Sequence, residues 1–201
     1  MARPKEFEIE NLKAAAYYVL AESNEKPNLT NIAKQAGINR TQLQNHYKFE
    51  ELRVLAVEHA LDILTSNIFK IFKSEDGAFD VKIKMLVMHC MTKAKKHPNL
   101  VSFIGKEYDL LEIETLKRFR QKASLDLKPF VNELERQVAQ GNFIATDALH
   151  VLMYIMSLAS YPIIAGDAIE MVTGTRSYAY RRVLSKHRDE IVAFILKGFR
   201  K

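Results

Sequence analysis

The sequence contains few of the residues that interrupt or cross-link a chain. Its 201 residues include one cysteine, five prolines, seven glycines and no tryptophan. One cysteine excludes an internal disulfide, and Cys90, inside an apolar run, is expected to be a small buried hydrophobic group. Because glycine and proline are rare and no stretch alternates steadily between apolar and polar residues, we expect an all-α fold.

Long apolar runs are also missing. No run approaches the length that spans a bilayer, and residues 1–6 lack the hydrophobic region of a signal peptide. We therefore expect a cytoplasmic protein. A hydrophobic content of 48% permits a sizeable core in one large or two small domains.

Motifs of common enzyme classes are absent from the sequence. There is no glycine-rich phosphate loop, no Cys-x-x-Cys pair and no His-Glu-x-x-His run. Asp147 and His150 share one face of a predicted helix, but two ligands do not complete a metal site, and a local hydrogen bond is the expected role. We expect neither catalysis nor a bound metal or cofactor.

Residues 28–47 predict two short helices joined by a tight turn. Apolar residues recur at three- and four-residue spacing in the first helix, and Asn28 is placed to cap it. Gly37 stands where the chain needs a positive φ. Ile38 is expected to close the core between the helices, and Asn39 to cap the second helix. This layout is typical of a helix-turn-helix and predicts DNA binding.

A set of residues in and after this segment also resembles a family signature. They are Ile32, Ala33, Ala36, Gly37 and Ile38, then Leu43, His46 and Tyr47, and later Leu55, Ala56 and Val57. Over residues 1–60 the pattern resembles the tetracycline-repressor (TetR) family, in which a Leu-x-x-His-Tyr or Leu-x-x-His-Phe step closes the recognition helix. The chain departs from the family where Phe49 and Glu50 replace a capping residue and a lysine, so Lys48 is the expected substitute for that phosphate contact.

The resemblance implies two parts: an N-terminal three-helix helix-turn-helix DNA-binding domain and a C-terminal helical ligand-binding and dimerisation domain. We place the functional boundary between 1–48 and 49–201, with a link helix at about 50–72. The resemblance implies a homodimer through C-terminal helices, for which the apolar segments Leu149–Leu158 and Ile191–Phe199 are suited. It also implies binding to double-stranded DNA with a palindromic operator, and repression relieved by a small-molecule effector.

The second helix of the motif contains the side chains that we expect to read DNA. Gln42, Gln44 and Asn45 are expected to bind base edges, because amides match N6 and N7 of adenine. Arg40 suits either a guanine or a phosphate. The residues expected to contact phosphate or to fix the docking register are Asn28, Thr30, Asn39, Thr41, His46, Tyr47 and Lys48. For Tyr47, packing beneath the helix is an equal alternative.

The net charge of +6 does not come from this segment. Residues 1–60 hold eight basic and eight acidic side chains, whereas residues 61–201 hold 22 and 16. Residues 26–49, however, include four basic residues and no acid, so the field is expected to be positive at the DNA face. Arg3 and Lys5 are expected to add phosphate or minor-groove contacts from an N-terminal arm.

Further helices are predicted on both sides of the motif, with a polar break at 74–77. They are Glu6–Ser23, Asp80–Lys96, Pro98–Gly105, Lys106–Gln140 with a kink or break at Pro129 and an end at Gly141, Thr146–Ser160, and Lys186–Phe199. Flexible and aromatic side chains in these helices suit an apolar ligand pocket: Met85, Met88, His89, Phe103, Tyr108 and Tyr154. A helical core has the same composition, so both interpretations stay open.

Two basic clusters follow within these helices, at Lys93–His97 and Lys117–Lys122. They suit either an anionic effector or a solvated helix face.

Taken together, these features of the sequence favour a DNA-binding transcriptional regulator. The alternative is a helical protein-interaction domain without specific DNA binding, in which Gln42 and Asn45 would be replaceable.

Overall fold

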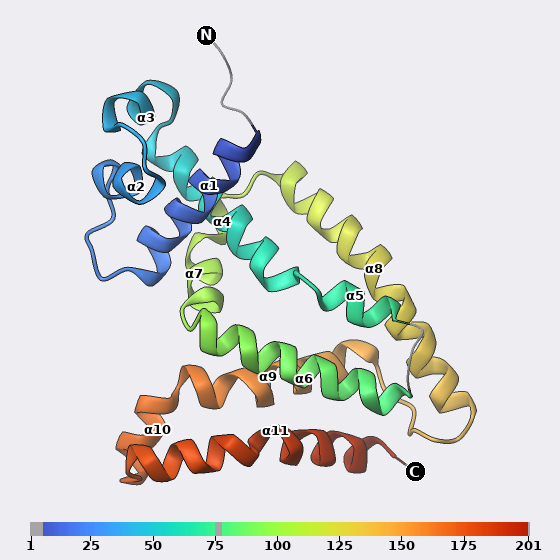
Figure 1. Ribbon diagram of the computed structural model, residues 1–201. Helices are drawn as coiled ribbons and strands as arrows, with labels where there is room; N and C mark the ends of the chain where they lie inside the picture. Colours follow the sequence, from blue (N-terminus) through green and yellow to red (C-terminus); the bar gives the residue numbers. More distant parts are fainter. Residues whose placement is uncertain (1–5, 75–77, 201) are drawn as a thin grey trace. The chain divides into compact units, whose positions relative to one another are not determined.

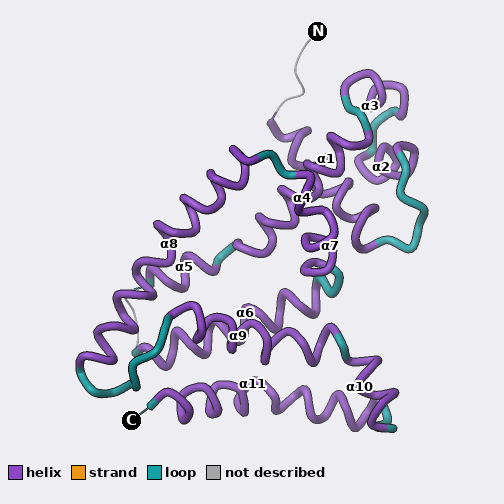
Figure 2. Tube along the Cα trace, turned by 180° about the vertical axis from the view of Figure 1, so that it is seen from behind, coloured by secondary structure: helices purple, strands orange, loops and turns teal. Residues whose placement is uncertain are grey.

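The computed structural model describes residues 6–74 and 78–200, and this part of the chain is all-α, as predicted (Figure 1). In chain order the elements are α1 (Glu6–Tyr17), the π-helical turn η1 (Tyr18–Glu22), α2 (Leu29–Ala36), α3 (Arg40–His46), α4 (Phe49–Thr65), α5 (Ile68–Lys73), α6 (Phe79–Lys96), α7 (Leu100–Glu107), the 3₁₀ turn η2 (Tyr108–Leu110), α8 (Ile113–Ala139), α9 (Ala148–Ile164), α10 (Gly166–Thr173) and α11 (Ser177–Phe199). Short loops join them (Figure 2).

The chain forms two compact units, and neither is continuous in sequence. The first unit comprises Met1–Ser66 and Asn99–Arg118, and the second comprises Asn67–Pro98 and Phe119–Lys201. The chain therefore crosses between the units three times. The functional boundary expected after Lys48 lies inside the first unit and stays a prediction.

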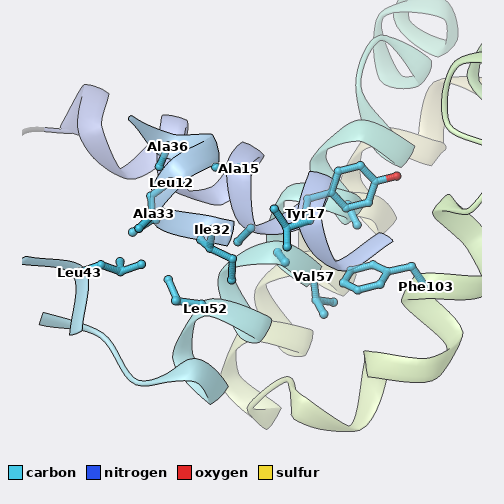
Figure 3. Close-up of a cluster of buried hydrophobic side chains, with 14 of the residues drawn as sticks. Leu12, Ala15, Tyr17, Ile32, Ala33, Ala36, Leu43, Leu52, Val57 and Phe103 are labelled. Atoms are coloured by element: carbon cyan, nitrogen blue, oxygen red, sulfur yellow. The ribbon is translucent and has the colours of Figure 1, made fainter. Parts of the chain in front are cut away.

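Helices α1, α2, α3, α4 and α7 share the core of the first unit (Figure 3). The side chains labelled there are Leu12, Ala15, Tyr17, Ile32, Ala33, Ala36, Leu43, Leu52, Val57 and Phe103. The ring of Tyr17 meets the ring of Phe103 edge-on, with centroids 5.6 Å apart, and its hydroxyl donates a 2.6 Å hydrogen bond to Glu22 Oε1. Removing these apolar surfaces from water is the main stabilisation of the unit.

The link helix predicted at 50–72 is broken, which corrects the sequence-based expectation. The helix ends at Thr65 and a new one begins at Ile68, visible as a loop-coloured segment between α4 and α5 in Figure 2. The hydroxyls of Thr65 and Ser66 each donate a 2.9 Å hydrogen bond to an earlier backbone carbonyl, which competes with the helical ladder. Asn67 then adopts a φ of 65°, a left-handed conformation that terminates helices.

Helices α5, α6, α8, α9 and α11 share the core of the second unit. Its centre is aromatic. The ring centroid of Phe130, on α8, lies 5.1 Å from that of Phe72 and 5.5 Å from that of Phe79. Phe79 meets Phe143 edge-on, with centroids 5.3 Å apart. Pro129 precedes Phe130 inside α8, which continues through it.

Other predicted helix ends shift for identifiable reasons. The long helix starts at Ile113 rather than Lys106, because the chain turns at η2 and buries Leu111 in the first core. The last helix begins at Ser177, nine residues earlier than predicted. Residues 177–186 contain no glycine or proline, so nothing interrupts a helix there. They lack a clear apolar stripe, which is why the sequence did not indicate the earlier start. Helix α10 was not predicted at all. The helix end predicted at Gly141 is confirmed, with a φ of 77°.

Two aspartates near helix starts take different roles. Asp147 caps α9, since the N–H of Leu149 donates a 2.6 Å hydrogen bond to its Oδ1, which confirms the local hydrogen bond expected for it. The sequence predicts a helix that starts at Asp80, but α6 begins one residue earlier, at Phe79. The Asp80 carboxylate is instead paired with the guanidinium of Arg200.

Some expectations concern residues outside the described part of the chain. These are the N-terminal arm with Arg3 and Lys5 and most of the polar break at 74–77. Among the described residues, no single helix is long and apolar enough to cross a membrane, and α9 and α10 reach that apolar length only as a pair bent by 68°.

Candidate nucleic-acid interface and ligand cavity

Local hydrogen bonds fix both helices of the predicted motif. The N–H of Asn31 donates to Asn28 Oδ1 at 2.9 Å, and the N–H of Thr41 donates to Asn39 Oδ1 at 2.7 Å. Both side chains thus cap helices as predicted, each satisfying a backbone donor that has no partner inside its helix. Gly37 has a φ of 69° between them, which confirms the glycine turn.

Helix α3 is anchored by one apolar side chain and is otherwise polar. Leu43 is 1% exposed and packs in the first core. The exposed side chains of this helix are Arg40, Thr41, Gln42, Gln44, Asn45 and His46. Within the described residues, no hydrogen bond or ion pair engages the side chains of Gln42, Gln44 or Asn45. These three amides are therefore available to a partner outside the chain.

The residues that follow α3 differ in their burial and in their hydrogen bonds. The half-buried ring of Tyr47 packs against the first core, while Lys48 is exposed. The N–H of Lys48 donates a 2.6 Å hydrogen bond to Glu51 Oε2, so Glu51 caps the start of α4. Glu50 is exposed in the first turn of that helix. One of the two acids that follow the motif thus has a structural role.

The basic residues of the segment remain on the surface. Lys26, Lys34, Arg40 and Lys48 are all exposed. Among the described residues, the one ion pair that these four side chains make is with Glu25, whose Oε1 lies 4.0 Å from Lys34 Nζ. A pair at that distance on the surface contributes little and is screened by salt. The surface around α2 and α3 therefore keeps the positive charge that a phosphate backbone attracts.

A cavity of about 410 Å³ opens between α5 and α6 in the second unit. The residues that line it are Asn67, Lys70, Ile71, Met85, Met88, His89 and Thr92. Three of the side chains predicted for a ligand pocket, Met85, Met88 and His89, thus lie together on one face of α6. Their role in binding stays a prediction.

The other three predicted pocket residues lie elsewhere. Phe103 is buried in the first core, and Tyr108 is exposed in η2, also in the first unit. Tyr154 is exposed on α9, with its ring 5.8 Å from that of Phe199. The spacing of α6 could have added Thr92, which follows Met88 and His89 on the same face. Nothing in the sequence pointed to the α5 residues, because their position depends on the break before that helix.

Comparison with solved structures identifies the fold. A protein assigned to the TetR family from Mesorhizobium loti matches with a TM-score of 0.66 at 15% identity, and 100% of each chain is covered. A TetR-family transcription regulator from Marinobacter aquaeolei matches with a TM-score of 0.63 at 12% identity, and 96% of each chain is covered. The chain has the TetR fold. This confirms the predicted architecture, a helix-turn-helix region followed by a helical C-terminal region.

The TetR fold extends to a structure solved with a ligand. The transcriptional regulator FadR from Bacillus subtilis, in complex with stearoyl-CoA, matches with a TM-score of 0.56 at 16% identity, covering 94% of this chain and 98% of that one. No protein-family model matches the sequence, and no curated protein sequence does. The likeness is therefore one of structure.

Cys90 is expected to be an unreactive thiol in the native protein. It lies on α6 against the second core, and burial raises its pKa to about 11. At pH 8 the reactive thiolate is then about 0.1% of the total, against roughly a quarter for an ordinary thiol. Reaction with a chromogenic disulfide should be slow at pH 8 and rise about tenfold per pH unit. Guanidinium-unfolded protein is the control, and equal rates in both states would contradict the prediction.

Proposed function

We propose that this protein is a sequence-specific DNA-binding transcriptional regulator. The observation that supports it most is α3, which shows six polar side chains to solvent while Leu43 holds it on the core. An exposed helix of this kind fits the major groove, where glutamine and asparagine amides pair with adenine. Gln42, Gln44 and Asn45 are the proposed base contacts.

The residues around these amides are proposed to position the helix on the duplex. Thr30, Arg40, Thr41, His46 and Lys48 are exposed and suit phosphate contacts. Asn28 and Asn39 act mainly through the helices that they cap. For Tyr47, the packed ring favours a supporting role beneath α3, with its hydroxyl left as the group to reach a phosphate.

We propose further that the protein is a homodimer through α9 and α11. Both helices bury one face in the second core and leave large apolar side chains exposed: Leu149, Met153, Met156 and Tyr161 on α9, and Tyr178, Val183 and Phe194 on α11. Exposed apolar surface of this extent marks an interaction site. A second copy would cover it and would place two α3 helices on a palindromic operator.

The cavity between α5 and α6 is the proposed effector site. A ligand that binds one arrangement of the protein better than another shifts the equilibrium, and its coupling to DNA binding is reciprocal. FadR, similar in structure, was solved with stearoyl-CoA, which supports a small-molecule effector here. We propose that binding releases the operator, so that the protein is a repressor. Catalysis has no part in this function.

Selection of bound sequences from a random duplex pool, at two salt concentrations, tests the DNA function. We expect a palindromic motif for the native protein. The Gln42→Ala/Asn45→Ala variant should bind the selected duplex about 30-fold more weakly, or worse, because each amide contact is worth roughly 1–3 kcal/mol of discrimination.

The matched control is Asn132→Ala, which removes an exposed amide from α8 in the second unit. It should select the same motif with unchanged affinity. Salt-sensitive binding without a motif, or no binding, would reject the regulator and favour a helical protein-interaction domain. A motif that survives in the Gln42→Ala/Asn45→Ala variant would reject the assigned base contacts.

A further inference from the structure

The cavity between α5 and α6 has an apolar wall made of flexible side chains. Ile71, Met85 and Met88 supply it, and Met85 and Met88 remain exposed within a unit that buries most of its other apolar side chains on the same helix. Methionine adapts its shape to irregular apolar surfaces. The volume of about 410 Å³ lies within the range of small-molecule sites. The wall suits the apolar body of a ligand.

The polar groups of the cavity include a cation and no carboxylate. Lys70 contributes a cation, Asn67 an amide and Thr92 a hydroxyl, and none of the residues that line the cavity is acidic. The face of α6 that includes Met85, Met88 and Thr92 continues into Lys95 and Lys96, both exposed. The cavity is therefore electropositive, because no carboxylate in its lining neutralises the Lys70 ammonium. A bound anion would supply that negative charge.

His89, which lines the cavity, has one buried nitrogen without a partner. Within the described residues, His89 Nε2 is buried and makes no hydrogen bond. Burial lowers the pKa of His89, and the charge of Lys93 lowers it further, so the imidazole is neutral near pH 7. A neutral ring has one N–H, and in the tautomer that places it on Nε2 this buried donor lacks an acceptor, which is costly and rare in folded proteins. A rotation of the ring would bring this donor into the cavity that His89 lines, where a ligand oxygen would satisfy it.

We propose that this cavity binds an organic anion with an apolar body, such as an alkyl carboxylate. Its apolar part lies against Ile71, Met85 and Met88. Its carboxylate accepts hydrogen bonds from His89 Nε2–H and from the Lys70 ammonium. The inference deepens the proposed function, on which it rests for the identification of this ligand with the effector.

The cavity adjoins the backbone break between α4 and α5. Asn67, which lines the cavity, has a φ of 65° and joins α4 to α5. A non-glycine residue in that conformation is held there by its surroundings. A ligand that contacts Asn67 favours one setting of this joint over others, and the joint is also where the chain leaves the first unit.

Calorimetric titration of the full-length protein, without DNA, tests the ligand class. The probes are decanoate, the uncharged decanamide and the cationic decylamine. We expect decanoate to bind at one site per chain and the other two to bind at least tenfold more weakly. Lys70→Ala should weaken decanoate binding at least tenfold, whereas Lys128→Ala, which removes an exposed lysine of α8 outside the cavity, should not change it.

A second variant separates binding from stability. His89→Leu removes the unpaired nitrogen, so the free protein should melt at a higher Tm while binding decanoate at least tenfold more weakly. Absence of decanoate binding, equal binding of decanamide, or unchanged binding by Lys70→Ala would overturn the proposal. DNA binding is measured separately on the ligand-free protein, so loss of operator binding would count against the regulator and not against the anion site.

Discussion

A Met153→Glu/Phe194→Glu variant is expected to be monomeric and to bind a palindromic operator about 10²–10⁴-fold more weakly than the native protein. Met153 is 53% exposed on α9 and Phe194 is 66% exposed on α11, so neither substitution disturbs the second core. Each places a charge where the proposed dimer interface excludes water, and an unpaired buried charge is strongly unfavourable. Once the dimer dissociates, the two half-sites of the operator are no longer bound by two connected α3 helices.

Analytical ultracentrifugation measures the oligomeric state, and fluorescence anisotropy measures the affinity for the operator. The control is Asn132→Glu/Gln140→Glu, which adds the same charge at two exposed positions, one on α8 and one just after its end, and should leave both the dimer and its DNA affinity unchanged. A Met153→Glu/Phe194→Glu protein that stays dimeric would show that α9 and α11 are not the interface. A monomeric native protein would reject the dimer itself.

The second large effect is expected at the aromatic centre of the second unit. Phe130→Ala should lower the free energy of unfolding by about 3–5 kcal/mol. Phe130 is fully buried, and its ring lies within 5.5 Å of two other rings, so the cavity left behind cannot collapse easily. Domains are stable by only about 5–15 kcal/mol, and the loss should lower Tm by roughly 6–20 °C.

Differential scanning calorimetry checks this value against two further variants. Phe130→Leu keeps an apolar group in the site and should cost less. Ile113→Ala truncates a side chain that is 71% exposed and should stay within about 0.5 kcal/mol of the native protein. A Phe130→Ala protein with the Tm of Ile113→Ala would show that this aromatic cluster does not stabilise the unit.

The helix-turn-helix region could be predicted from the sequence because its geometry is local. The caps at Asn28 and Asn39 and the positive φ of Gly37 depend on residues within one helical turn. Such preferences act within a few residues of chain, whatever the rest of the protein does. The exposed face of α3 followed from the same pattern, since Leu43 alone is anchored in the core.

The break before α5 and the cavity could not be predicted in this way. The hydroxyls of Thr65 and Ser66 can bond to backbone carbonyls in an intact helix or at its end, and the sequence does not decide which. Met88 and Phe103 looked alike as apolar helix residues, yet one lines a cavity and the other fills the first core. Their difference arises from packing between segments distant in sequence, which periodicity does not encode.

The discontinuity of the first unit has a consequence for how the protein is made. Leu100, Phe103 and Leu111 are buried in the core that α1–α4 form, so that core is incomplete when Ser66 is added to the growing chain. The chain up to Arg118 takes roughly 3–10 s more to synthesise at about 5–20 residues per second. During that interval a nascent chain already contains all of α3 but not the complete core against which Leu43 packs. If residues 1–66 alone were joined to the second unit of a related protein, the transplanted segment would lack Leu100, Phe103 and Leu111, and its core would stay incomplete.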